Sequence, residues 1–83
     1  MDINTIVKKT NAFLIDEIEV DPALLLRTAD LREDLSIDSL DFVDIVVLVE
    51  RNFGFKLKAE EMNEVRTLED FYLYIEQKLK SAR

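Results

Sequence analysis

The sequence predicts an all-α fold: a small antiparallel four-helix bundle, with three main helices, one short helix and a long first loop. Three observations favour this class. The 83 residues include one Gly and one Pro, whereas turn-rich β folds use more of both. Apolar residues recur at helical spacing in several segments. The length suits one domain, residues 1–83, with one core.

The first predicted helix spans residues 2–16, and Pro22 lies beyond it, where it prevents further helix. One face of this helix is apolar or weakly polar, with residues at steps of three and four: Ile3, Ile6, Val7, Thr10, Phe13 and Leu14. The connection over residues 19–38 is long, and such loops are usually functional or contain short helical pieces. We expect its apolar side chains to pack onto the core: Leu24, Leu25, Leu26, Leu31, Leu35 and Ile37.

The second predicted helix spans residues 39–52. Asp38 is a favourable N-cap, Asp41 places negative charge in the first turn, and Gly54 provides the C-terminal stop. Residues 55–57 are expected to be extended, and residues 59–63 to form short helical turns. The last helix begins near Thr67. Thr67 and Asp70, three residues apart, resemble a capping box. Its apolar stripe is regular: Leu68, Phe71, Tyr72, Ile75 and Leu79.

The second helix is more apolar than a single buried face requires. At 100° per residue, one sector is predicted to face the core: Phe42, Ile45, Val46, Val49 and Phe53. Another sector is expected to be exposed: Asp41, Asp44, Leu48, Arg51 and Asn52. Between them lie Leu40, Val43 and Val47. Apolar residues rimmed by acids along one helix are typical of a docking surface.

Composition excludes several function classes. The formal net charge is −7, from 18 acidic and 11 basic residues, and nucleic-acid binding needs the opposite sign. The chain has no Cys and no His, which excludes disulfides, thiolate catalysis, Cys/His zinc sites and a His-dependent triad. The N-terminal residues lack the pattern of a signal peptide. No apolar run approaches the ~18 residues of a transmembrane segment, and we expect a cytoplasmic monomer.

Ser39 opens the second helix, and two interpretations need no cofactor. Serine and aspartate are common at helix starts because they cap the first N–H groups. A catalytic serine would instead need a base to take its proton, and the chain has no His to provide it.

The context of Ser39 resembles a known family. The segment Leu35-Ser36-Ile37-Asp38-Ser39-Leu40-Asp41 is similar to the attachment motif of acyl carrier proteins, Leu-Gly-x-Asp-Ser-Leu-Asp. The similarity continues on both sides, through residues 31–35, 50–54, 58–61 and 67–71. The resemblance implies that a phosphopantetheinyl transferase joins 4′-phosphopantetheine from coenzyme A to Ser39, within a motif that includes Asp38 and Leu40. The arm's thiol, which the chain itself lacks, would carry acyl groups as thioesters for fatty-acid, polyketide or related lipid biosynthesis.

The resemblance also implies partners and a cargo site. Acyl-loading enzymes, ketosynthases or acyltransferases would dock basic patches against Asp41, Asp44, Val47 and Glu50. Members of this family can shelter the acyl chain between helices. The candidate walls are Phe42, Val43, Val46, Leu57 and Met62, for each of which ordinary core packing is the simpler interpretation.

The sequence departs from the family pattern twice. Ser36 stands where the family usually has Gly, which strains the loop if φ is positive there. Arg51 stands where the family usually has an acid, which indicates dedicated partners. Two alternatives stay open: an aminoacyl or peptidyl carrier, and a helical protein–protein adaptor that is never modified. Small size and the missing His and Cys disfavour an enzyme.

Overall fold

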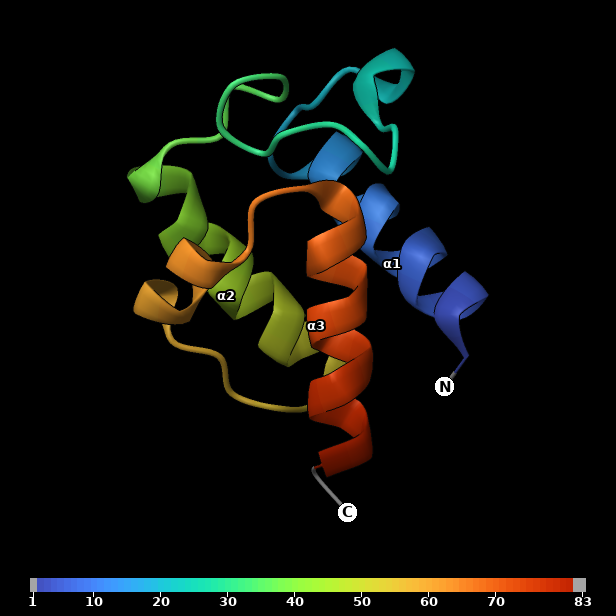
Figure 1. The fold of residues 1–83 in the computed structure, drawn as a ribbon. Helices are drawn as coiled ribbons and strands as arrows, with labels where there is room; N and C mark the ends of the chain where they lie inside the picture. Colours follow the sequence, from blue (N-terminus) through green and yellow to red (C-terminus); the bar gives the residue numbers. More distant parts are fainter. Residues whose placement is uncertain (1, 82–83) are drawn as a thin grey trace.

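Three long helices form the body of the molecule (Figure 1). The computed structural model describes residues 2–81. Within that range α1 spans Ile3–Asp16, α2 spans Ser39–Phe53 and α3 spans Leu68–Ser81, while two 3₁₀ helices, η1 and η2, span Pro22–Leu24 and Ala59–Glu64. Helix α1 packs along α3, and α2 contacts α1 on one side and η2 on the other. The predicted all-α bundle with three main helices and one short helix is confirmed, and η1 is a further turn inside the long first loop.

The sequence predicts the caps of α2 and α3, and the structure shows a third cap at α1. Asp2 accepts a hydrogen bond from the Thr5 N–H at 2.9 Å and so caps α1. At the start of α3, the Thr67 hydroxyl accepts from the Asp70 N–H, and the Asp70 carboxylate accepts from the Thr67 N–H, both at 3.2 Å. Gly54 ends α2 with φ of 81°, a left-handed conformation that favours glycine.

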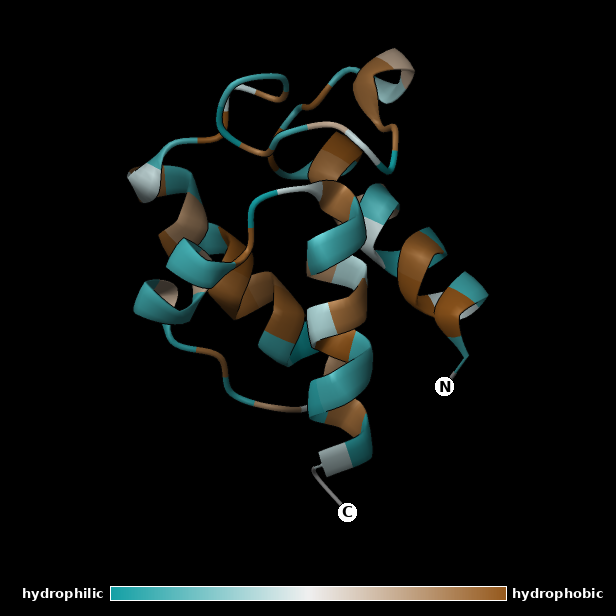
Figure 2. Cartoon of the chain, viewed as in Figure 1, coloured by the Kyte–Doolittle hydropathy of each residue, from teal (hydrophilic) through white to brown (hydrophobic). Residues whose placement is uncertain are grey.

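The core lies where the three long helices and the first loop meet. Helix α3 contributes Leu68, Phe71 and Ile75, none of which has any exposed surface. Helix α1 contributes Ile6 and Leu14, which are equally buried. Figure 2 shows the apolar residues of the helices alternating with hydrophilic ones along each ribbon, as expected for helices that bury one stripe.

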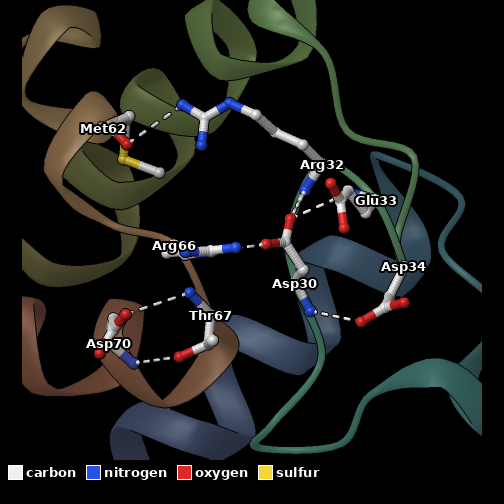
Figure 3. Close-up of polar contacts among 8 residues, drawn as sticks. All are labelled: Asp30, Arg32, Glu33, Asp34, Met62, Arg66, Thr67 and Asp70. Atoms are coloured by element: carbon white, nitrogen blue, oxygen red, sulfur yellow. Dashed lines mark hydrogen bonds and ion pairs between the residues drawn. The ribbon is translucent and has the colours of Figure 1, made fainter.

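The first loop is tied to the start of α3 by backbone and side-chain bonds. The Leu31 N–H donates to the Arg66 carbonyl at 2.9 Å, and the Leu68 N–H donates to the Ala29 carbonyl at 3.0 Å. The Arg66 guanidinium pairs with Asp30 at 3.2 Å (Figure 3). Asp30 also accepts from the backbone N–H groups of Glu33 and Arg32, and these hydrogen bonds lower the pKa of its carboxyl. The loop therefore holds a fixed position over one end of the bundle.

The prediction that the loop's apolar residues all pack onto the core is wrong for two of them. Leu31, Leu35 and Ile37 are buried, but Leu24 is 44% exposed and Leu26 is 62% exposed. The segment around η1 bonds to itself: the Leu24 N–H donates to Asp21 and the Leu26 N–H to Leu24, both at 2.9 Å. This tight turn directs the two leucines outward.

Candidate functional site

Ser39 is the first residue of α2 and is exposed to solvent. The cap of this helix is Asp38, whose Oδ1 accepts from the N–H groups of Leu40 at 3.0 Å and Asp41 at 3.1 Å. Asp41 completes a capping box, because its carboxylate accepts from the Asp38 N–H at 3.3 Å. Since Asp38 performs the capping, the hydroxyl of Ser39 is not needed for it, and Ser39 is exposed at the tip of the helix.

The segment before Ser39 is anchored on both sides of a strained residue. Leu35 and Ile37 are 6% and 2% exposed, and the Ile37 N–H donates to the Leu31 carbonyl at 3.0 Å. Between them Ser36 adopts φ of 58°, which is the left-handed region where a side chain costs free energy. The φ of Ser36 is therefore positive, and the serine strains the loop as expected for that case. The anchored backbone fixes where α2 begins and hence where Ser39 lies.

The exposed face of α2 is apolar along its middle. Leu40 is 77% exposed, Val43 53% and Val47 49%. At 100° per residue these three lie between the exposed Glu50 on one side and the exposed Asp44 on the other. The surface made by these five residues, here called the α2 face, joins an apolar stripe to flanking acids. It begins at Ser39 and continues toward the C-terminal end of the helix.

The prediction that Leu48 lies in the exposed acidic sector is wrong. Leu48 is 7% exposed and lies against α1, where it lines a groove together with Phe13. Asn52 is half-buried on the same side; its side-chain amide donates to the Leu48 backbone carbonyl at 2.8 Å, and its backbone carbonyl accepts from the Lys9 ammonium at 3.4 Å. Helix α2 therefore buries two sides, one against α1 and one against the core, and the remaining exposed arc is centred on the apolar stripe.

The predicted partner-binding residues are not equally available. Asp44, Val47 and Glu50 are exposed, but Asp41 is half-buried and its carboxylate is used in the capping box. Val43 belongs to the α2 face and was missing from the predicted docking set. Its helical angle, which lies between those of Glu50 and Val47, is the signal that could have placed it there.

The predicted cargo walls separate into two groups. Phe42, Leu57 and Met62 lie in the core, at 4%, 7% and 0% exposure. Val46 is partly buried against that core. Val43 lies on the surface, so in this structure it does not face the interior. These three buried residues come from α2, from the segment before η2 and from η2 itself.

The site can hold a covalently attached group. An exposed hydroxyl at a helix tip can accept a phosphodiester without displacing a buried contact. Among residues 2–81 no group of three or more His, Cys, Asp or Glu side chains is arranged to hold a metal ion. In the same part of the chain no helix is long and apolar enough to cross a membrane.

Comparisons with known proteins agree with this geometry. Residues 12–75 match the family model described as "Phosphopantetheine attachment site". The acyl carrier protein of Thermosynechococcus vestitus is 33% identical over 79 residues, covering 95% of this chain and 98% of that protein. The acyl carrier protein of Coprothermobacter proteolyticus is also 33% identical over 79 residues, covering 95% and 96%. That of Rubrobacter xylanophilus is 33% identical over 75 residues, covering 90% and 93%. The chain therefore belongs to the acyl carrier protein family, and its cofactor is a covalently attached 4′-phosphopantetheine.

Proposed function

We propose that Ser39 is the attachment residue and that the protein carries acyl intermediates between the enzymes of fatty-acid or related lipid biosynthesis. The observation that carries the assignment is the exposed hydroxyl of Ser39 beside a cap that Asp38 supplies. When bound, the arm supplies the thiol that this chain lacks and holds acyl groups on it as thioesters. The chain's own part is to present that arm, without catalysis, at the tip of a rigid helix.

Intact mass spectrometry tests this assignment. The purified protein is incubated with coenzyme A, Mg²⁺ and a promiscuous phosphopantetheinyl transferase, and a gain of one phosphopantetheine is expected. Ser39→Ala should abolish the gain. Ser36→Ala is the matched control, because Ser36 is also exposed and lies three residues away, and it should still be modified. Modification of the Ser39→Ala variant, or none of the wild type, would overturn the assignment.

The same comparison separates a carrier from an unmodified adaptor. An adaptor would bind its partners through the α2 face, so Ser39→Ala would leave its binding and its cellular role intact. A carrier would lose its function with the same substitution. The α2 face does not by itself distinguish an acyl cargo from an aminoacyl or peptidyl cargo, and loading assays with acyl and aminoacyl donors separate these two.

We also propose that the α2 face docks basic patches on the transferase and on the loading, ketosynthase and acyltransferase enzymes. Asp44 and Glu50 flank the apolar stripe and are exposed, so each can pair with a partner cation. Single exposed ion pairs contribute only ~0–1 kcal/mol, which favours fast and reversible association. A carrier that visits several enzymes in turn needs contacts of that strength.

Charge reversal tests the docking surface. Asp44→Lys should lower kcat/KM for modification or loading, and the loss should shrink as ionic strength rises, because salt screens exposed charges. Glu64→Lys is the matched control: Glu64 is an exposed acid at the end of η2 and outside α2. Equal losses in the two variants would indicate a net-charge effect and contradict a specific docking role for Asp44.

The interior near Phe42, Leu57 and Met62 is the proposed shelter for the acyl chain. Burial of apolar groups contributes ~0.8 kcal/mol per methylene, which favours movement of a long chain from water into the core. A sheltered thioester should be cleaved by hydroxylamine more slowly than an exposed one. A Met62→Glu variant should cleave at the rate of a short-chain thioester if this interior is the shelter.

A further inference from the structure

Arg32 is a cation held over the first turn of α2. Its guanidinium carbon lies 4.8 Å from the centroid of the Phe42 ring, a distance typical of cation–π stacking. Its Nη2 donates to the Met62 carbonyl at 3.4 Å, so the side chain crosses from the first loop toward η2 (Figure 3). Stacking on Phe42, which is 4% exposed, gives the guanidinium a defined position despite its exposure to solvent.

The acids next to Arg32 in the sequence do not neutralise it. Asp30 accepts from the backbone N–H groups of Arg32 and Glu33 and pairs with Arg66, while Asp34 accepts from the Asp30 N–H at 2.7 Å (Figure 3). Among residues 2–81, the ion pairs within 4.0 Å involve other cations: Arg27, Arg66, Lys78 and Lys80. A guanidinium has five N–H donors, so most of those on Arg32 are left for another anion.

The stacking on Phe42 places this cation over a residue one helical turn from Ser39. Residues three apart on a helix are surface neighbours, with Cβ atoms about 5–6 Å apart. Side chains on a helix also lean toward its N-terminus, so the Phe42 ring covers the turn that precedes it. That turn begins at Ser39. The guanidinium of Arg32 therefore stacks on the helical turn that Ser39 opens, on the side that leads to the buried Phe42 and Met62.

We propose that Arg32 binds the phosphodiester of the arm attached to Ser39 and is a positioning residue for that arm. This inference rests on the proposed attachment at Ser39. The new phosphodiester adds a negative charge next to the carboxylates of Asp38 and Asp41, and like charges at close range repel. A guanidinium offers the planar fork of donors that matches phosphate oxygens. The contact offsets the repulsion and directs the arm toward the interior side of α2.

Comparison of apo and holo stability tests the proposal without measuring activity. The measured quantity is the melting temperature of the holo form minus that of the apo form. In Arg32→Gln this difference should be about 2–5 °C lower than in the wild type. Arg51→Gln is the matched control, since it removes the same charge from the far end of α2, about 18 Å along the helix, and it should respond to the arm as the wild type does. Arg32→Lys, which keeps the charge, should retain part of the wild-type response.

A second readout is the ³¹P resonance of the holo protein, which should shift in Arg32→Gln and stay in place in Arg51→Gln. If Arg32 only fastens the loop to η2, Arg32→Gln will lower the melting temperatures of the apo and holo forms equally and leave the ³¹P resonance unmoved. That outcome would overturn the proposal. Absence of any mass gain on incubation with the transferase would instead overturn the attachment at Ser39, so the two failures are distinguishable.

Discussion

Glu61 joins η2 to α3, and its removal should weaken the fold in a pH-dependent way. Its Oε2 accepts from the Lys58 N–H at 2.8 Å, while its Oε1 accepts from the Tyr74 hydroxyl at 2.6 Å and pairs with Lys78 at 3.0 Å. These hydrogen bonds, that from the Lys58 N–H first, lower the pKa of Glu61 from 4.5 to about 2. Three separate donors on one carboxylate make it the main polar link between the two elements.

The magnitude follows from proton linkage. A group whose folded pKa is depressed stabilises the fold above its unfolded pKa, and that contribution is lost as pH falls through the folded value. The window here runs from about pH 5 down to about pH 2. Because one pKa unit corresponds to 1.36 kcal/mol, the shift sets an upper limit of about 3 kcal/mol. The Glu61 side chain is 27% exposed, so solvent screening reduces our expectation to about 1–2 kcal/mol.

Urea unfolding of Glu61→Gln at pH 7 and pH 3 measures this contribution. At pH 7 the variant should be less stable than the wild type by about 1–2 kcal/mol, and at pH 3 the gap should narrow. Glu60→Gln is the control, because Glu60 is exposed and its substitution removes the same charge from the same 3₁₀ helix. Equal stabilities of the two variants at pH 7, or an unchanged gap at pH 3, would refute the reasoning.

Three further changes test other parts of the structure. Ser36→Gly should raise the free energy of unfolding by up to about 1 kcal/mol, because glycine relieves the positive φ; a lower melting temperature would contradict the strain. Leu48→Ala should cost about 2–4 kcal/mol and Val47→Ala less than about 1 kcal/mol, since the first is buried and the second exposed; equal costs in urea unfolding would contradict the orientation of α2. Asp38→Ala should cost about 1 kcal/mol through loss of the cap, and calorimetry of the apo protein checks it.

The helix limits could be predicted from sequence because local signals set them. Asp38 and Asp41 form their capping box within a single turn, and Gly54 ends α2 through its own backbone conformation. Ser39 is proposed as the attachment residue for a related reason, since its neighbours in the chain carry the motif. Features that depend only on residues three or four apart need no knowledge of the tertiary fold.

The orientation of α2 could not be predicted in the same way. An amphipathic pattern identifies one buried stripe, but α2 has a second partner, α1, which buries Leu48 beside Phe13. The exposed face is consequently centred on the stripe of Leu40, Val43 and Val47. Of the predicted acidic sector, Asp44 and Arg51 are exposed. Which side a second helix covers depends on how the long first loop folds, and the periodicity of α2 does not contain that information.

If the acyl chain enters the core as proposed, the polar links of η2 bear on how long that chain must be. Arg32 and Glu61 hold η2 from two sides, by bonds at the Met62 carbonyl and at Tyr74 and Lys78. If loosening η2 costs about 2–3 kcal/mol, in line with the Glu61 estimate and one further hydrogen bond, burial at ~0.8 kcal/mol per methylene offsets it after about three or four methylenes. The melting temperature of acyl forms should therefore stay near the holo value for acetyl and butyryl cargo and rise from hexanoyl onward. In Glu61→Gln the rise should begin at a shorter chain, and an unchanged onset would show that η2 does not control entry.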